Sequence, residues 1–495
     1  MVNPKRNSSA VGQESQESQT NAPSQPDCSN IDQVPGIVDY DQAIEFWFGR
    51  INYERRSPRK SDLKLDRTFA LLEQIGNPHQ AYPIVHVAGS KGKGSTAAML
   101  ASVLSKAGHR TGLFTSPHLT RVEERFQING ESISSVELTD LVAEVAKVVA
   151  EMDRQLPLEQ HPTFFEIGTA LGFLFFARRQ VDVAVIEVGL GGRFDSTNVC
   201  DPTVAIITSI SLDHVQQLGN HLASIAREKA GIIKPNRPTI SGVLAPEARV
   251  VIEETASERS SELTQLGRDI DYRYEPGVIT PGEQILPKLQ VTTRNGTWPT
   301  MELGLLGEHQ AANAALAFAA VEELRKRGFS ISEAAVSSGL RDVHWPARLE
   351  VVSHAPLVVL DCAHNRASCQ AGLKTLETTF GGHAAGSEEK SGKKFLVFAS
   401  SRDKDVSGMF EVLAPHFDSI ILTCFQDNPR CLSPEDLASL LETTVSTKPI
   451  LCYSTQEAWV KVTALATAED TILITGSVFL AGEFHAMFAD GSRTN

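Results

Sequence analysis

A glycine- and lysine-rich turn between a short apolar run and an amphipathic stretch constrains the fold of this sequence most. The run Pro83–Ala88 predicts a buried strand, and apolar residues at helical spacing follow from Met99 up to Gly108. Between them lies the turn Gly89-Ser90-Lys91-Gly92-Lys93-Gly94-Ser95. Glycines in such a turn let backbone N–H groups surround phosphate oxygens, and the helix N-terminus favours their negative charge. Because two lysines this close would repel each other without an anion, we predict a phosphate-binding loop.

The same letters also match a second pattern, the dinucleotide-binding fingerprint GxGxxA, at Gly92–Ala97. That fingerprint needs an acidic residue about 20 positions further on, near the end of the second strand, to hold a ribose. The corresponding place is occupied by Thr115-Ser116-Pro117-His118. The missing carboxylate disfavours a nicotinamide-dependent dehydrogenase.

Other apolar runs alternate with amphipathic stretches, which is the pattern of a βαβ architecture. Val181–Val188 and Thr203–Ile210 are almost continuously apolar, as expected of parallel strands covered on both faces. Asn295-Gly296 between two short runs predicts a hairpin. A second group of predicted strands comprises Pro356–Leu360, Lys394–Ala399, Ser419–Thr423 and Thr471–Thr475. We therefore predict an α/β protein with an N-terminal parallel-sheet, P-loop ATPase-like domain and a smaller C-terminal Rossmann-like α/β domain.

The length of 495 residues supports two domains, because single hydrophobic cores usually stop growing at about 250–300 residues. We predict a disordered tail at 1–35, domains at 36–349 and 350–490, and a mobile loop at Gly381–Lys393. The net charge of −14 does not suit non-specific nucleic-acid binding, and no apolar stretch reaches the roughly 18–20 residues that span a membrane. The seven cysteines form no CxxC pair, which favours reduced thiols in the cytoplasm.

Polar residues follow three of the predicted strands, at the edge where parallel sheets collect their ligands. They are Ser116, Glu187 and the pair Asp213-His214. A carboxylate that ends an apolar strand beside a phosphate loop is a usual means of holding Mg²⁺ against nucleotide phosphates. For His214 a metal-ligand role and a structural role both stay open, because Mg²⁺ prefers oxygen.

Lys229 is an unexpected residue, because it shares one face of a predicted helix with Leu222, Ile225 and Ala226. An inward-facing lysine is costly unless it is paired, deprotonated or modified. The alternative is that its apolar stem lies along the core while its amine reaches water.

Two further segments also allow a structural and a functional interpretation. Thr163-Phe164-Phe165-Glu166 has the spacing of a capping box, and its two aromatic residues could equally line a pocket for a flat ring. Asn313 could be an exposed helix residue. Asp361-Cys362-Ala363-His364-Asn365 ends a predicted strand of the second domain, where a polar cluster is typical of a functional site.

Together these motifs resemble the folylpolyglutamate synthase/dihydrofolate synthase family, within the Mur-ligase-like ATP-dependent amide ligases. The resemblance extends from about Tyr40 to Phe484. Its further motifs are Leu65-Asp66-Arg67, Thr115–Leu119, Gly189–Asn198, Arg227–Gly231, Gly307–Gln310 and Trp345–Arg348. The chain departs from the family pattern at Ser90-Lys91, where the family often has Thr-Asn, and at Ala347 and Cys362, where the family has glycine.

The resemblance implies a role for each motif. The residues expected to contact ATP are Gly89, Ser90, Lys91, Gly92, Lys93, Gly94, Ser95, Asn313, Arg348 and Asp361. The expected Mg²⁺ ligands are Ser116, Glu187 and His214. The residues expected to line the pterin-bearing substrate are Leu63, Lys64, Leu65, Asp66, Thr163, Phe164, Phe165, Glu166, Phe194, Asp195 and Ser196. The expected catalytic residues are Lys93, His214 and Lys229, the last as a carbamylated lysine.

The implied reaction is the ATP-dependent addition of L-glutamate to a folate, and also to dihydropteroate, by a monomeric enzyme. ATP would phosphorylate the substrate carboxylate, and the amine of glutamate would attack the resulting acyl phosphate. A Mur-type ligase of peptidoglycan precursors is the first alternative, although Gly94 and the Thr163–Glu166 segment disfavour it. A nucleotide-binding module without catalysis is the second.

Overall fold

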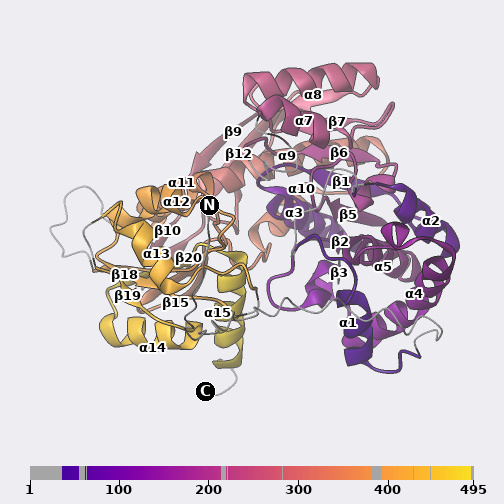
Figure 1. Ribbon diagram of the computed structural model, residues 1–495. Coiled ribbons are helices and arrows are strands. Elements are labelled where there is room, and N and C mark those ends of the chain that lie inside the picture. The colour runs from indigo at the N-terminus through magenta and orange to yellow at the C-terminus, as the bar shows by residue number, and fades with distance from the viewer. Residues whose placement is uncertain are drawn as a thin grey trace, which may run out of the picture.

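The computed structural model describes residues 36–54, 62, 64–212, 219, 221–280, 283–380, 392–426, 428–445 and 448–491. The predicted tail at 1–35 and the predicted loop at Gly381–Lys393, except for its last two residues, lie outside this part of the chain. Figure 1 shows two α/β lobes side by side, the first drawn in indigo to pink and the second in orange to yellow. None of the helices in the described ranges combines the length and apolar character that a membrane crossing requires.

In the described part of the chain, eight strands form the sheet of the first lobe, in the order β4-β3-β2-β5-β1-β6-β7-β8. Their bounds are β1 Ile84–Ala88, β2 Thr111–Phe114, β3 Phe126–Ile128, β4 Glu131–Ser132, β5 Val183–Glu187, β6 Val204–Ile207, β7 Thr239–Ser241 and β8 Leu263–Gln265. β1 lies in the middle and pairs in parallel with both β5 and β6. The carboxyl ends of β1, β2, β5 and β6 therefore meet at one edge of the sheet, where parallel sheets bind their ligands.

Helices cover both faces of this sheet because consecutive residues of its strands point to opposite sides. In β5, Val183 and Val185 pack in one buried cluster, whereas Ala184 and Ile186 pack in another. The helices of the first cluster are α3 (Lys93–Lys106), α9 (Glu308–Lys326) and α10 (Glu333–Arg341). Those of the second are α1 (Tyr40–Phe48), α2 (Asp66–Gln74), α4 (Ser135–Gln155) and α5 (Phe164–Arg178). Beside β6 and β7 lie α7 (Leu222–Ala230) and α8 (Pro246–Glu258).

Short antiparallel strands follow the first sheet in the chain. They are β9 (Ile270–Glu275), β10 (Val278–Thr280), β11 (Glu283–Ile285), β12 (Lys288–Thr293), β13 (Gly296–Thr297) and β14 (Met301–Glu302). Thr292 of β12 lies opposite Thr297 of β13. The hairpin predicted at Asn295-Gly296 is therefore confirmed.

The second lobe contains a six-stranded sheet, within the described residues, in the order β15-β16-β20-β17-β18-β19. Its strands are β15 Glu350–His354, β16 Leu357–Leu360, β17 Lys394–Phe398, β18 Ser419–Leu422, β19 Ile450–Leu451 and β20 Thr471–Thr475. The helices on its two faces are α11 (Arg366–Thr375), α12 (Val406–Leu413) and α13 (Pro434–Leu441), and α14 (Thr455–Leu465) and α15 (Val478–Gly491). The predicted α/β class is confirmed, while the division into domains at 349/350 stays a prediction.

Contacts between segments far apart in the chain join the two lobes. Arg430 donates through Nη2 to the Glu54 carbonyl at 3.0 Å, and the Glu54 carboxylate pairs with Arg125 at 2.7 Å. A Cβ added to Gly482 of α15 would lie 2.2 Å from the Leu119 carbonyl, which follows β2. The second lobe thus rests directly on the edge of the first sheet where its parallel strands end.

Candidate functional site

The loop after β1 makes a tight turn into α3, as the sequence predicted. Gly92 caps the helix in the left-handed conformation, with φ +83°. A Cβ added there would lie 2.1 Å from Asn313 Oδ1, and one added to Gly94 would lie 2.8 Å from the Trp345 ring. Glycine is therefore required at both positions, because α9 and the segment that joins the lobes approach the loop this closely.

The first half of the loop is bound to the segment that follows β6. The Ser90 N–H donates to the Ser209 carbonyl at 2.7 Å, and the Lys91 N–H donates to the Ser209 hydroxyl at 3.0 Å. The Thr208 hydroxyl donates to the Lys91 carbonyl at 2.5 Å. The first-turn N–H groups of Lys93–Ser95, by contrast, have no acceptor inside their own helix. The second half of the loop, at the start of α3, is thus the part best suited to an anion.

Glu187 ends β5 beside this loop. The Lys93 ammonium lies 3.8 Å from Glu187 Oε1, and the Ser116 N–H donates to Glu187 Oε2 at 3.3 Å. The Glu187 residue is only 5 % exposed, and this burial raises its carboxyl pKa against the opposing effects of Lys93, the Ser116 N–H and Arg348. A buried carboxylate with cationic neighbours is thereby placed at the end of the central strands.

Two of the three predicted metal ligands lie together at this edge. Glu187 offers carboxylate oxygens and Ser116 a hydroxyl, and oxygen is the donor that Mg²⁺ prefers, so these residues fit that ion. Asp213 and His214 lie outside the described residues. Among the residues that are described, no group of three or more His, Cys, Asp or Glu side chains could hold a metal ion. The metal site as a whole stays a prediction.

Lys229 turns inward from α7, as its helix face indicated. Its ammonium donates to the Gly89 carbonyl at 2.9 Å, and the residue is 4 % exposed. The alternative in which its amine reaches water is therefore wrong. The neighbouring Glu228 carbonyl accepts from the Arg193 N–H at 2.7 Å, which ties the end of α7 to the loop after β5.

Three residues predicted to contact the nucleotide come from outside the first sheet. Asn313 of α9 lies against Gly92, and its Nδ2 donates to Gln310 Oε1 at 3.0 Å. Asp361, after β16, is buried, and this burial raises its carboxyl pKa against the effect of the Arg348 guanidinium. Arg348 thus acts electrostatically on Asp361 of the second lobe and on Glu187 of the first.

The Thr163–Glu166 segment begins α5 with a complete capping box. The Thr163 hydroxyl accepts from the Glu166 N–H at 3.3 Å, and the Glu166 carboxylate accepts from the Thr163 N–H at 2.8 Å. Glu166 also pairs with Arg67 at 2.8 Å, which joins α5 to α2. Phe164 stacks on Trp47 in the core, with 5.0 Å between ring centroids. These contacts support the structural interpretation of three of the four residues.

The other residues predicted to bind the pterin range from buried Ser196 to exposed Phe194. Phe165 covers Gly189, where an added Cβ would lie 2.3 Å from its ring, and Phe194 is 40 % exposed. The Ser196 hydroxyl lies 2.6 Å from the Thr169 hydroxyl. Lys64 and Asp66 are exposed, Leu65 packs at the margin of the core, and Leu63 lies outside the described residues.

Asp195 holds the loop after β5 in shape. Its carboxylate accepts from the Leu190 N–H at 2.8 Å, the Thr197 N–H at 3.0 Å and the Thr197 hydroxyl at 2.5 Å. His86 Nε2 lies 2.8 Å from that hydroxyl, whose one proton is already donated, so Nε2–H must be the donor. Burial, aided by the charge of Lys234, lowers the pKa of His86 to about 3. The roles of His86 and Thr197 were not predicted from the sequence. The available signal was a histidine inside an apolar strand.

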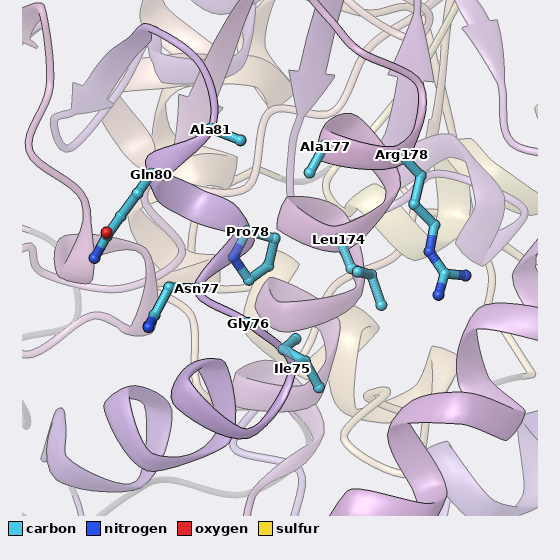
Figure 2. Close-up of a pocket in the computed structure, with 9 residues that line it drawn as sticks. All are labelled: Ile75, Gly76, Asn77, Pro78, Gln80, Ala81, Leu174, Ala177 and Arg178. Carbon is cyan, nitrogen blue, oxygen red and sulfur yellow. The ribbon is translucent and has the colours of Figure 1, made fainter.

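An open hollow of about 600 Å³ lies at the opposite edge of the first sheet. Figure 2 shows side chains of two segments facing each other across it, the α2–β1 connection and the end of α5. The lining residues are Ile75, Gly76, Asn77, Pro78, Gln80, Ala81, Leu174, Ala177 and Arg178. They precede β1 and β5, and they include none of the predicted site residues. The hollow is therefore separate from the candidate site.

Comparison with known proteins identifies two family domains in this order. The chain matches the Mur ligase middle domain over residues 87–321 and the Mur ligase, glutamate ligase domain over residues 347–478. It is 38% identical to the dihydrofolate synthase/folylpolyglutamate synthase of Bacillus subtilis, over 75% of this chain and 83% of that protein.

Solved structures agree with this match. Folylpolyglutamate synthase of Mycobacterium tuberculosis complexed with ADP has a TM-score of 0.79 and 33% identity, covering 91% of this chain and 98% of that one. E. coli FolC in complex with DHPP and ADP has a TM-score of 0.78 and 30% identity, covering 93% of this chain and 100% of that one.

Relatives differ in length. The probable bifunctional folylpolyglutamate synthase/dihydropteroate synthase of Halobacterium salinarum is 33% identical over 90% of this chain, but the chain spans about half, 51%, of that protein. The match to the B. subtilis enzyme, by contrast, covers most of both proteins. From its fold, its two domains and these relatives, the chain belongs to the dihydrofolate synthase/folylpolyglutamate synthase family of Mur ligases.

Proposed function

We propose that this protein is an ATP-dependent ligase that adds L-glutamate to folates, and also to 7,8-dihydropteroate, through an acyl phosphate. The observation that carries the proposal is the junction of Lys93, Glu187 and the start of α3 at the carboxyl ends of the central strands. The names of the relatives support the substrates, and the ADP in the similar structures supports the nucleotide. The same names favour folate over a peptidoglycan precursor.

The first-turn amides of α3 and the ammonium of Lys93 bind the terminal phosphates of ATP. Lys93 neutralises charge as the γ-phosphate passes to the substrate carboxylate, which makes that carboxylate a better electrophile. Ser116 and Glu187, with His214, hold Mg²⁺, which supplies further charge neutralisation when it is bound. Asn313 lies over Gly92 and confines the phosphate end of the nucleotide.

The second lobe completes the site. Arg348, in the segment that joins the lobes, and Asp361 of the second lobe contact the nucleotide. The contact between the lobes keeps water from the acyl phosphate before the amine of glutamate attacks. Lys229 is carbamylated in the active enzyme, where its burial beside Gly89 lowers the cost of a neutral amine that captures CO₂. Phe165 and Phe194 offer aromatic surface to the pterin.

We further propose that the protein works as a cytoplasmic monomer. Its cysteines in the described ranges, Cys200, Cys362, Cys369, Cys424, Cys431 and Cys452, are all free, which suits a reducing compartment.

One assay tests the reaction. The protein is incubated with MgATP and L-glutamate, together with either dihydropteroate or tetrahydrofolate, and products are read by mass spectrometry. The expected result is a product one glutamate heavier and one ADP per bond formed. Release of ADP with no glutamate-containing product from either substrate would reject the ligase proposal, and product from tetrahydrofolate alone would restrict it to folate extension.

A further inference from the structure

The segment that joins the lobes contains two residues in an unfavourable backbone conformation. Ala347 has φ +53° and Leu349 has φ +51°, in the left-handed region that residues with a Cβ rarely adopt. Both residues are buried. Such a conformation persists only where surrounding contacts hold it, and these cluster at functional sites.

Two carboxylates hold this turn, one for each strained residue. Glu350 Oε2 accepts from the Ala347 N–H at 2.8 Å, and Asp361 Oδ1 accepts from the Leu349 N–H at 3.1 Å. The Ala347 carbonyl also accepts from the Cys362 N–H and from Arg348 Nη1, both at 3.0 Å. Both backbone polar groups of Ala347 are therefore hydrogen-bonded in the left-handed conformation.

The turn sets the position of the Arg348 backbone, and with it the point from which the side chain extends. A left-handed residue stands on each side of Arg348, and the Cys362 contact fixes the turn against the end of β16. Trp345, three residues earlier, lies against the phosphate loop at Gly94. The same short segment thus contacts the loop and presents Arg348 beside it.

Of the two carboxylates that hold the turn, Glu350 is the one that has no expected contact with ATP. It is the first residue of β15, and its side chain reaches back three positions to Ala347. We propose that Glu350 is a positioning residue, whose carboxylate holds the left-handed turn of Ala347–Leu349 and thereby presents Arg348 to the bound nucleotide. This inference rests on the proposed function, because it assumes that Arg348 contacts ATP.

Three variants separate this role from a general effect on stability. Glu350→Ala removes the acceptor of the Ala347 N–H, whereas Glu350→Gln keeps an oxygen that accepts it. Ala347→Gly combined with Glu350→Ala gives a turn that adopts positive φ without a carboxylate, because glycine has no Cβ. The matched control is Glu457→Ala, since Glu457 Oε2 accepts from the Tyr453 N–H at 2.7 Å in the same lobe, away from the site.

The measurements are KM for ATP, the dissociation constant for a non-hydrolysable ATP analogue, and the melting temperature. Glu350→Ala is expected to raise both ATP constants about tenfold, because the Ala347 N–H loses its hydrogen bond to a charged acceptor. Glu350→Gln is expected to raise them less than about threefold. The double variant should recover most of the lost affinity, and Glu457→Ala should leave the ATP constants unchanged.

Two results overturn the inference. One is that Glu350→Ala lowers the melting temperature as Glu457→Ala does, with no change in the ATP constants. The other is that the double variant binds ATP as weakly as Glu350→Ala alone. If the wild-type protein forms no glutamate product, the proposed reaction fails, but the affinity for the ATP analogue still decides the role of Glu350.

Discussion

The buried ammonium of Lys229 and the carbonyl of Gly89 are joined by a hydrogen bond of 2.9 Å. This contact connects the last turn of α7 to the first residue of the phosphate loop. Burying an ammonium is costly. The burial of Lys229 therefore indicates that this side chain has a function that an exposed lysine would not serve.

Replacing Lys229 with methionine is expected to lower kcat at least about a hundredfold, because the loop loses its buried donor and the proposed carbamate cannot form. Lys234→Met is the matched control, as Lys234 is half-buried and likewise donates to a carbonyl, that of Asn198, at 2.9 Å. Steady-state kinetics and the NMR signal of carbamate from labelled bicarbonate measure the two effects. A carbamate signal that survives in Lys229→Met would place the modification elsewhere.

Lys93→Met should reduce glutamate ligation by about a thousandfold, because the transferred phosphate loses its nearest positive charge. Lys106→Met is the control on the same helix, where Lys106 pairs with Asp342 at 2.9 Å near the surface. The turnover of each variant is measured at saturating MgATP. Turnover of Lys93→Met at the wild-type rate would remove Lys93 from the mechanism.

Ala347→Gly alone should raise the free energy of unfolding by about 1 kcal/mol, since glycine adopts positive φ without the strain that alanine has there. Ala334→Gly, in an exposed position of α10, should instead lower it by about 0.5–1 kcal/mol. Denaturant unfolding of both variants measures these changes. Equal destabilisation by the two substitutions would show that the turn is unstrained.

The buried His86 predicts a loss of stability in acid. Because its pKa is about 3 in the folded protein, the unfolded chain binds a proton below its ordinary value near 6.5 and the folded chain does not. The contribution of neutral His86 is therefore present above that value and is lost as the pH falls from about 6.5 towards 3.

From pH 7.5 to pH 5 this loss amounts to about 2 kcal/mol. His86→Gln, which keeps a donor for Thr197 but does not titrate, should show a correspondingly smaller difference between the two pH values. Urea unfolding at each pH measures it. The same pH dependence in wild type and variant would assign the effect to other groups.

Much of the fold could be predicted because its signals are local. Pro83–Ala88 contains β1 almost to the residue, and the bounds of α7 follow from an apolar face that ends at Gly231. β7 and β19 were not predicted, since strands of three and two residues are too short to carry a periodic pattern. The strand expected at Thr203–Ile210 ends at Ile207, because the next residues direct their hydroxyls to the phosphate loop.

The site could be predicted as residue types at strand ends, but not as contacts. Lys93, Glu187 and Ser116 meet because parallel strands end at one edge, which the alternation of strands and helices implies. Asp195 was predicted to contact substrate, yet its carboxylate serves the loop amides of Leu190 and Thr197. Such an assignment depends on a backbone conformation that no spacing in the sequence encodes.

The contact between Glu54 and Arg430 spans 376 positions of the chain. During synthesis the first lobe is complete once α10 has been made, at Arg341, and compact units fold as they emerge, at about 5–20 residues per second. The newborn first lobe therefore spends many seconds with its ligand edge formed and without the arginine that will rest on it. In that interval, whether the first lobe aggregates depends on its own exposed surface, because the second lobe does not yet cover it.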